Sequence, residues 1–482
     1  MPMPSRSVRL TTRAALLAAF APLLACSSLP PADEAAARVD VPAGWSITDA
    51  AGAGATAVSD ASLAAWWQRF GDAPLNRLVA SALQANTSVL SAQAALRQAQ
   101  ALRDVAAAAL WPSLGGSASA GRGMAAGQST GNTVRVGLDA NWTLDVFGAN
   151  RAAVDASAAA ADASAATLGD VQVQIAAETA LDYLLLRTAQ ARTAIAAQNL
   201  ASQEETLQIT LWRQQAGLLT SLEAEQARAA VEQNRALLPT LQTSIVQSQH
   251  ALAVLTGQPP AALPWLVDPL ADAPAVPQSR DDFVPAIPAQ TLRQRADVRA
   301  AEYQVAAALS RVGQARAQRW PNFSIGGSLG LSAASLGALG NRSAALGSLL
   351  ASVTLPIFDG GALRAQVRAQ QAALAQAQQV YRAAVLTALK DVEDALVALR
   401  GDRLRLASLR LAADAATNAA LLARQRYGSG LIDFQTVLET QRTEFSTRDG
   451  VVTASADVGS DHVRLFKALG GGWPSDASPT PP

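Results

Sequence analysis

The sequence is poor in the residues on which most enzymes and nucleic-acid-binding proteins depend. Its 482 residues contain one cysteine and two histidines, which excludes internal disulfides and cysteine-rich metal sites. His250 and His462 lie outside any His-Glu-x-x-His motif, and the sequence has no Gly-x-x-x-x-Gly-Lys-Ser/Thr phosphate loop. Lys plus Arg and Asp plus Glu both number 38, so no basic excess points to nucleic acid. We therefore expect no catalytic residue, no metal or other cofactor, and no nucleic-acid partner.

Large side chains are scarce as well. Aromatic residues make up 5% of the chain and charged residues 16%, while half of the chain is apolar and much of that half is alanine. Small side chains suit closely packed helices better than a large globular core. The composition therefore favours a helical protein.

Two long stretches without proline dominate the sequence. The first follows the corner Asn141–Gly148 and meets no proline before Pro239, and the second extends from Ala362 to about Tyr427 after the corner Val353–Gly361. A helix of about 65 residues would be about 100 Å long at 1.5 Å per residue. Helices of that length are far beyond the usual globular range.

The two stretches belong to an internal repeat. Three landmarks recur in the same order, with offsets of 209, 211 and 213 residues: Trp111 with Trp320, Phe147 with Phe358, and Gly217 with Gly430. A period this long excludes the common short solenoid repeats. The pattern indicates a tandem duplication.

Each half is predicted to follow one plan of helix, β-hairpin, long helix and return helix. The first half has a helix over 75–109, a strand over 113–121, a second strand into Trp142, and a return helix over 218–256 that Pro239 should kink. The second half has a helix over 289–319, a hairpin over 321–358 and a return helix over 431–469. A coiled-coil seam is predicted in its long helix at Val385, Leu389, Val392, Leu396 and Leu399. Core candidates in the first long helix are Leu168, Ile175, Leu181 and Leu185.

The beginning of the chain is typical of an exported lipoprotein. Three arginines precede the short apolar run Ala14–Ala25, which has the pattern of a signal peptide and is too short to span a membrane. The run ends in Leu23–Ser27, which resembles the bacterial lipobox, so that Cys26 would become the lipidated first residue after cleavage. The alternative is a plain signal peptide with a chance cysteine. Ser27 in place of aspartate favours passage to the outer membrane.

These observations divide the chain into six segments. They are a signal peptide (1–25), a lipidated tether (26–60), a first repeat (61–257), a Pro-rich connector (258–288), a second repeat (289–470) and a disordered tail (471–482).

The four predicted strands have the length of tilted membrane-barrel strands. Backbone groups in lipid must all be paired, so such strands require a closed barrel, and several chains would have to share it. Trp111, Trp142, Trp320 and Phe323 lie at or near the strand ends, where an aromatic girdle would be. The alternative is a soluble four-stranded sheet on a helical bundle.

Several motifs resemble those of the TolC-type outer membrane efflux channels, in particular the lipidated, NodT-like outer membrane factors that serve resistance-nodulation-division (RND) pumps. The motifs are Trp66-Trp67-x-x-Phe70-x-Asp72, Leu144-Asp145-Val146-Phe147-Gly148, Arg295-Ala-Asp297-Val298-Arg299 and Pro356-Ile357-Phe358-Asp359-Gly360-Gly361. The resemblance covers roughly Ser62 to Leu469. Ala296 stands where the family usually has proline.

The resemblance implies a mainly α fold with transmembrane β-strands. Long antiparallel coiled coils and four strands per chain would assemble as a homotrimer, with a twelve-stranded β-barrel and an α-helical periplasmic tunnel. The implied function is the outer membrane duct of a tripartite efflux system in a Gram-negative bacterium, joined to a periplasmic adaptor and an inner-membrane RND-type pump. Two alternatives are a periplasmic coiled-coil lipoprotein without a pore and the exit duct of a type I protein secretion system.

The resemblance also assigns two sites. Gly217, Leu218, Gly430 and Leu431 fall at the helix–helix tips, where the family's adaptor hairpins dock. Tyr427, Asp433 and Glu439 are candidates for the periplasmic gate. Glu439 stands where aspartate is usual, and Thr436 and Ile432 replace the usual acidic and arginine residues, so that Asp433 is the candidate substitute. The alternative for Glu439 is a solvated helix face.

Overall fold

The computed structural model describes residues 40–46, 63–123, 131–260, 262, 276–279, 291–292 and 294–473. The predicted signal peptide, Cys26 and most of the predicted connector and tail lie outside these residues. The chain forms two compact units. The sheet unit contains Ala99–Ala161 and Tyr303–Val380, and the helical unit contains Val39–Gln98, Asp162–Glu302 and Tyr381–Pro482.

The two halves of the chain repeat one order of elements with equal helix lengths. The helices α4 (Thr87–Ala108) and α8 (Ala296–Ala317) each have 22 residues, α5 (Ala149–Gln215) and α9 (Ala362–Gly428) each have 67, and α6 (Ser221–Leu255) and α10 (Phe434–Ala468) each have 35. Two strands lie between α4 and α5, and two lie between α8 and α9. The predicted duplication and the predicted long helices are confirmed.

The helix predicted over 75–109 is wrong in one respect, because it is two helices. α3 (Ala73–Ala85) ends at Asn86, which has extended backbone angles, and α4 begins after it. The Asn86 side chain accepts from the N–H of Ser88 at 2.8 Å and donates to the carbonyl of Leu255 at 2.9 Å. A side chain that bonds to nearby backbone competes with the helix and starts a new one.

Capping residues also set the beginnings of the return helices, which lie three residues later than predicted. Thr220 and Glu223 form a capping box before α6, and the carboxylate of Asp433 accepts from the N–H of Thr436 before α10. Pro239 lies inside α6, which continues through it. In the second half, residues 291, 292 and 294 are helical, the helix is interrupted at Arg295, and α8 begins at Ala296. The predicted start at residue 289 lies outside the described residues.

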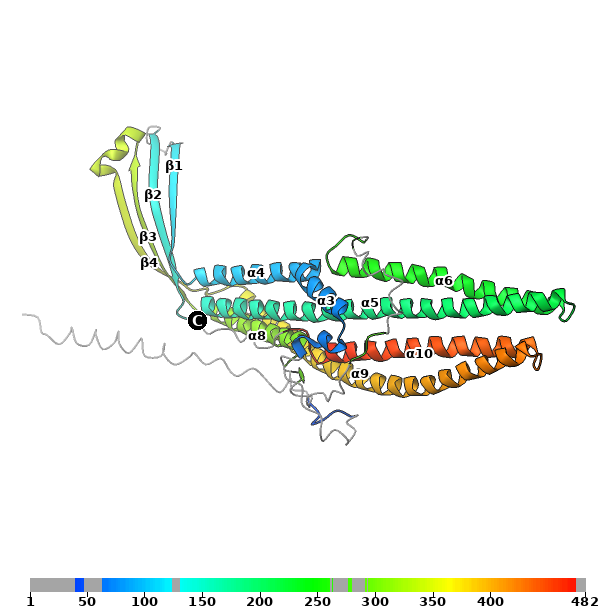
Figure 1. Cartoon of the computed structure of the whole chain (residues 1–482). Coiled ribbons are helices and arrows are strands. Elements are labelled where there is room, and N and C mark those ends of the chain that lie inside the picture. Colours follow the sequence, from blue (N-terminus) through cyan, green and yellow to red (C-terminus); the bar gives the residue numbers. More distant parts are fainter. Residues whose placement is uncertain are drawn as a thin grey trace, which may run out of the picture. The chain divides into compact units, whose positions relative to one another are not determined.

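Four strands form one antiparallel sheet in the order β1–β2–β3–β4 (Figure 1). They are β1 (Ser113–Gly123), β2 (Gly131–Leu144), β3 (Asn322–Ala333) and β4 (Ala345–Thr354). Each half supplies one hairpin, and β2 pairs with β3 to join the halves. The short 3-10 helices η5 (Leu336–Gly340) and η6 (Arg342–Ala344) connect β3 to β4, with Asn341 between them.

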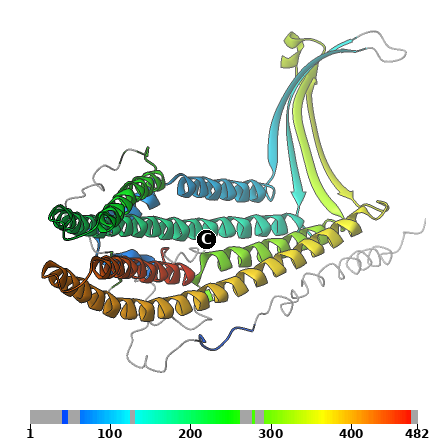
Figure 2. The same ribbon diagram turned by 90° about the vertical axis from the view of Figure 1, so that its right-hand side faces the viewer.

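In the helical unit, each return helix lies along a long helix. α6 follows the C-terminal part of α5, and α10 follows that of α9, in both views (Figures 1 and 2). The predicted seam in α9 is confirmed, because Val385, Val392 and Leu399 are buried. Among the described helices, none is both long and apolar enough to cross a bilayer.

The core of the helical unit is built around two tryptophans. Trp66 and Trp67 lie in η3 (Trp66–Phe70), and both indoles are buried. The ring of Trp66 stacks on Phe466 of α10 with 5.4 Å between centroids, and Tyr183 of α5 joins the same cluster. Because the buried residues come from distant segments, this cluster holds η3, α5 and α10 together.

One piece of the segment predicted as a tether is packed. Trp45 is only 6% exposed and contacts the buried residues of α9 and α10. The N–H of Ser46 donates to the carboxylate of Glu393 at 2.8 Å. This part of the predicted tether therefore lies against the helical unit, and the remainder falls outside the described residues.

Candidate functional sites: a two-faced sheet and paired hairpin tips

One face of the sheet is almost entirely apolar. Directly paired residues of an antiparallel sheet point to the same side, so the register assigns every side chain to a face. On the apolar face, β2 supplies Val134, Val136, Leu138, Ala140, Trp142 and Leu144, and β3 supplies Phe323, Ile325, Leu329 and Leu331. Its polar members, Arg122 and Asn132, are paired with each other beside the β1–β2 connection.

The opposite face is made of small and polar residues. It includes Ser113, Ser117 and Ser119 of β1, Thr133, Arg135, Asp139, Asn141 and Thr143 of β2, and Ser324, Ser328 and Ser332 of β3. Hydroxyl groups bond across it, as between Ser324 and Ser352 and between Ser328 and Ser348, both at 2.7 Å. Leu346 and Leu350 of β4 are exceptions, and each lies opposite a glycine of β3.

This division suits a wall between lipid and water. Strands of a membrane barrel alternate apolar side chains toward lipid with polar side chains toward the interior. The strands have 11, 14, 12 and 10 residues, which is the length needed to cross a bilayer. A soluble sheet packed on a helical bundle would bury its apolar face, whereas Leu329 and Leu349 are 68% and 82% exposed in the single chain.

Aromatic residues gather where the strands meet the helices. The indole Nε1 of Trp142, near the end of β2, donates to the carbonyl of Leu110 at 2.9 Å. Phe147 stacks on Trp320, just before β3, with 5.5 Å between the ring centroids. Trp111 and Trp320 stay largely exposed. These four aromatic residues have the placement expected for a girdle at a membrane boundary.

The second site consists of the two hairpin tips of the helical unit. Gly217 and Gly430 have φ angles of 72° and 76°, the left-handed conformation that glycine adopts without a Cβ penalty. The next residue in each tip, Leu218 or Leu431, is more than 70% exposed. The two tips thus repeat one geometry and each presents a leucine to solvent.

Arg213 of α5 joins the first tip to the second. Its guanidinium donates to the carbonyl oxygens of Tyr427 at 2.8 Å and Gly428 at 3.0 Å, the last residues of α9. The same group lies 4.4 Å from the centre of the Tyr427 ring, and Tyr427 itself is buried. Because helix C-termini leave carbonyls without intrahelical partners, a cation placed there caps the neighbouring helix. No pattern in the sequence indicates this role for Arg213.

The other gate candidates lie on α10 or just before it. Asp433 is exposed and caps α10, and its hydrogen bonds from the side chain and backbone of Thr436 lower the pKa of its carboxyl. Glu439 is exposed on α10. The structure therefore brings Tyr427 into the contact between the tips, but it does not bring Glu439 into that contact.

α10 also carries a buried acidic group that no sequence motif indicates. Asp461 is fully buried and accepts from Arg464 at 2.8 Å, while its second carboxylate oxygen has no donor among the described residues. Burial, together with the nearby Asp402 carboxyl of α9, raises the pKa of Asp461 to about 6, although Arg464 acts in the opposite direction. A proton shared between the two acids would supply the missing donor.

Comparison with known proteins gives one consistent result. The sequence pattern of the family described as outer membrane efflux protein matches residues 78–258 and 287–471. Nodulation protein T of Rhizobium leguminosarum bv. viciae is 32% identical over 468 residues, which cover 96% of this chain and 95% of that protein. Outer membrane protein OprJ of Pseudomonas aeruginosa is 32% identical over 417 residues, which cover 84% of this chain and 86% of OprJ.

Among solved structures, the outer-membrane channel OprN is similar along nearly its whole length. It matches with a TM-score of 0.79 and 33% identity, over 87% of this chain and 97% of OprN.

Proposed function

The chain belongs to the outer membrane efflux protein family, and we propose that three copies of it form the passive exit channel of a tripartite efflux system. It is an outer membrane protein, and its part in efflux is to conduct cargo outward. The chain itself would carry out no chemistry, because the inner-membrane pump supplies the driving force. The cargo would be drugs or other small molecules.

The observation that carries this proposal is the two-faced sheet. An apolar face with large exposed leucines needs lipid, and a face of serine, threonine and charged residues needs water. Four strands have two free edges, which lipid does not tolerate, and a barrel of only four strands is too narrow to close. Three chains supply twelve strands, enough to close a barrel with an open interior. A coiled-coil spacer without a pore would have no use for this sheet.

The hairpin tips are proposed as the docking surface for a periplasmic adaptor. Leu218 and Leu431 expose apolar surface next to Gly217 and Gly430, and the exposed Trp212 adds to it on the first tip. Exposed apolar groups of this kind are typical of interaction sites. An adaptor would connect these tips to an RND-type inner-membrane pump.

The membrane and pore proposals can be tested together. We expect the purified protein to migrate as a heat-modifiable trimer and to give channel currents in planar bilayers. A Cys26→Ser variant removes the proposed acyl anchor, and it should remain in the outer membrane because the barrel holds it there. Release of this variant as a water-soluble monomer, with no channel current from the native protein, would contradict the proposal.

The periplasmic gate is proposed at the second tip, with Tyr427, Asp433 and Glu439. In a trimer, three Glu439 carboxylates would form a ring of negative charge that favours cations. We expect Glu439→Ala to shift the reversal potential in a KCl gradient toward weaker cation preference, and Glu205→Ala, an exposed carboxylate on α5, to leave it unchanged. Unchanged conductance and selectivity in Glu439→Ala would rule out the ring.

A further inference from the structure

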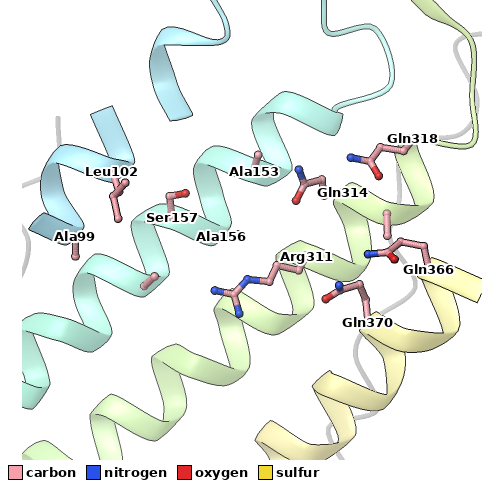
Figure 3. A pocket seen from close by; sticks show the side chains of 12 residues that line it. Ala99, Leu102, Ala153, Ala156, Ser157, Arg311, Gln314, Gln318, Gln366 and Gln370 are labelled. Atoms are coloured by element: carbon pink, nitrogen blue, oxygen red, sulfur yellow. The ribbon is translucent and has the colours of Figure 1, made fainter. Parts of the chain in front are cut away.

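Segments of four helices, all within the sheet unit, line a cavity of about 520 Å³. The lining residues come from α4, α5, α8 and α9, and Figure 3 shows their side chains around one opening. Gln318 stands four residues before β3, and Gln366 stands four residues after the start of α9, so the cavity lies next to the sheet. Its volume is in the range of small-molecule sites in proteins.

The lining divides into small apolar groups and polar side chains. Alanines of α4, α5 and α8, together with Leu102 of α4, provide the apolar part: Ala99, Leu102, Ala153, Ala156, Ala160 and Ala315. Amide side chains provide most of the polar part: Gln314, Gln318, Gln366 and Gln370. Helical spacing places Gln366 and Gln370 on one face of α9. Gln314 lies in the last turn of α8, and Gln318, the residue after α8, donates its backbone N–H to the carbonyl of Gln314 at 3.0 Å.

Arg311 is the single charged residue among the described residues that line this cavity. Arg311 lies on α8 and is exposed in the single chain. Arg192 of α5, by contrast, pairs with Asp449 at 2.7 Å. Within the described part of the chain, Arg311 has no hydrogen bond or ion pair. The cavity therefore has a net positive charge and unused guanidinium donors.

We propose that this cavity is a subsite on the wall of the channel for the carboxylate of an amphipathic organic acid. A guanidinium can donate two parallel hydrogen bonds to a carboxylate, and the neighbouring glutamine amides can donate further ones. The alanines leave room for the apolar part of the same molecule. The inference rests on the proposed function in one respect, because only in a closed trimer would this cavity open onto a shared passage.

The charge at the cavity can be measured with a cysteine reporter. Gln314→Cys places a thiol among the lining residues, and the chain has one other cysteine, Cys26, whose reaction is subtracted with the unsubstituted protein. The probes are an anionic and a cationic methanethiosulfonate reagent on the purified trimer. Adding Arg311→Gln should lower the ratio of anionic to cationic reaction rates by at least about threefold at low salt.

Arg368→Gln is the matched control, because Arg368 is an exposed arginine of α9 that does not line the cavity. The same substitution there should leave the ratio within experimental error. An unchanged ratio in Arg311→Gln, or an equal fall in Arg368→Gln, would overturn the inference. The reporter needs no ion current, so a native protein that fails to conduct would count against the proposed function alone.

Carboxylate binding is tested by protection of the same thiol. Benzoate should slow its reaction with an uncharged thiosulfonate reagent, and benzyl alcohol, which lacks the charge, should protect only at about tenfold higher concentration or more. The difference should disappear with Arg311→Gln and persist with Arg368→Gln. Equal protection by benzoate and benzyl alcohol, or none by either, would show that Arg311 is only a solvated side chain.

Discussion

Gly169, inside α5, is an example of a single residue whose missing side chain matters. A Cβ at this position would stand 2.7 Å from the indole of Trp473, whose Nε1 donates to the carbonyl of Gln294 at 3.1 Å. We expect Gly169→Ala to lower the free energy of unfolding by about 1–3 kcal/mol through overpacking. In a Trp473→Ala background the same change should raise it by about 0.5–1 kcal/mol, since alanine is the better helix former. Denaturant unfolding followed by circular dichroism measures both, and losses of equal size would contradict the contact.

Asp461 is a second single residue with a measurable effect, because it makes the stability of the fold depend on pH. Its pKa of about 6 lies above the usual value of 3.8, so the folded state holds a proton that the unfolded state releases. The stability from this group is therefore present below pH 4 and is lost as the pH rises through 6. Asp461→Asn keeps the oxygen that accepts from Arg464 and removes the ionisation.

We expect Asp461→Asn to raise the free energy of unfolding at pH 8 by on the order of 1–3 kcal/mol, and to bring little gain at pH 4. Asp457→Asn is the control, because Asp457 is 41% exposed and pairs with Arg405. That variant should be neutral or slightly destabilising at pH 8. Thermal unfolding midpoints across this pH range decide the matter, and a gain from Asp461→Asn that is equal at both ends would exclude the shared proton.

At the scale of elements, the sequence predicts the long helices well because their signal is long and regular. The seam of α9 is correct at Val385, Val392 and Leu399. In α5 the prediction of Leu185 as a core residue is wrong: it is 57% exposed, while Leu184 and Leu186 are buried. An apolar stripe drifts around a straight helix by about 20° per heptad, so a choice among adjacent leucines needs the packing partners.

The sequence does not predict the contacts between the two halves of the chain. Gly217 and Gly430 could be placed at the tips, because glycine marks a chain reversal. The hydrogen bond from Arg213 to the end of α9 joins residues that are 214 positions apart. The periodicity of apolar residues along a helix does not predict such a pair. Likewise, the sequence of β2 alternates apolar and polar residues, so its two faces can be predicted. β1 is rich in glycine and alanine, and only its register with β2 shows which residues lie on which face.

The Arg213 contact leads to a prediction about the hairpin tips. We expect Arg213→Ala to destabilise the contact between the tips by about 1–2 kcal/mol, since two charge-assisted hydrogen bonds are lost. Backbone amides near Gly430 should then exchange faster with solvent, and the resting channel should conduct more. Arg228→Ala removes an exposed arginine that pairs with Glu225 on its own helix, and it should change neither property. A tip that exchanges no faster in Arg213→Ala would show that Arg213 does not hold the second tip.

At the scale of the whole molecule, the duplicated halves explain why a single chain is incomplete. Each half contributes one hairpin, and the β2–β3 pairing joins the two hairpins into a sheet whose outer strands, β1 and β4, each have a free edge. Pairing of β4 with β1 of the next copy would satisfy both edges and carry the apolar face around the outside of a barrel. The polar face would then line the interior.

This arrangement makes adjacent residues of β3 differ in what they tolerate. Leu329 lies on the apolar face, and Ser328 lies on the polar face. We expect Leu329→Lys to cost about 2–4 kcal/mol per subunit, because it puts a charge into lipid, and to reduce the heat-modifiable trimer in outer membrane fractions. Ser328→Lys loses one hydroxyl contact with Ser348, worth about 1 kcal/mol, and places its charge in water, so the trimer should form. Equal yields from the two variants, or a lower yield from Ser328→Lys, would mean that the faces are assigned to the wrong sides of the membrane wall.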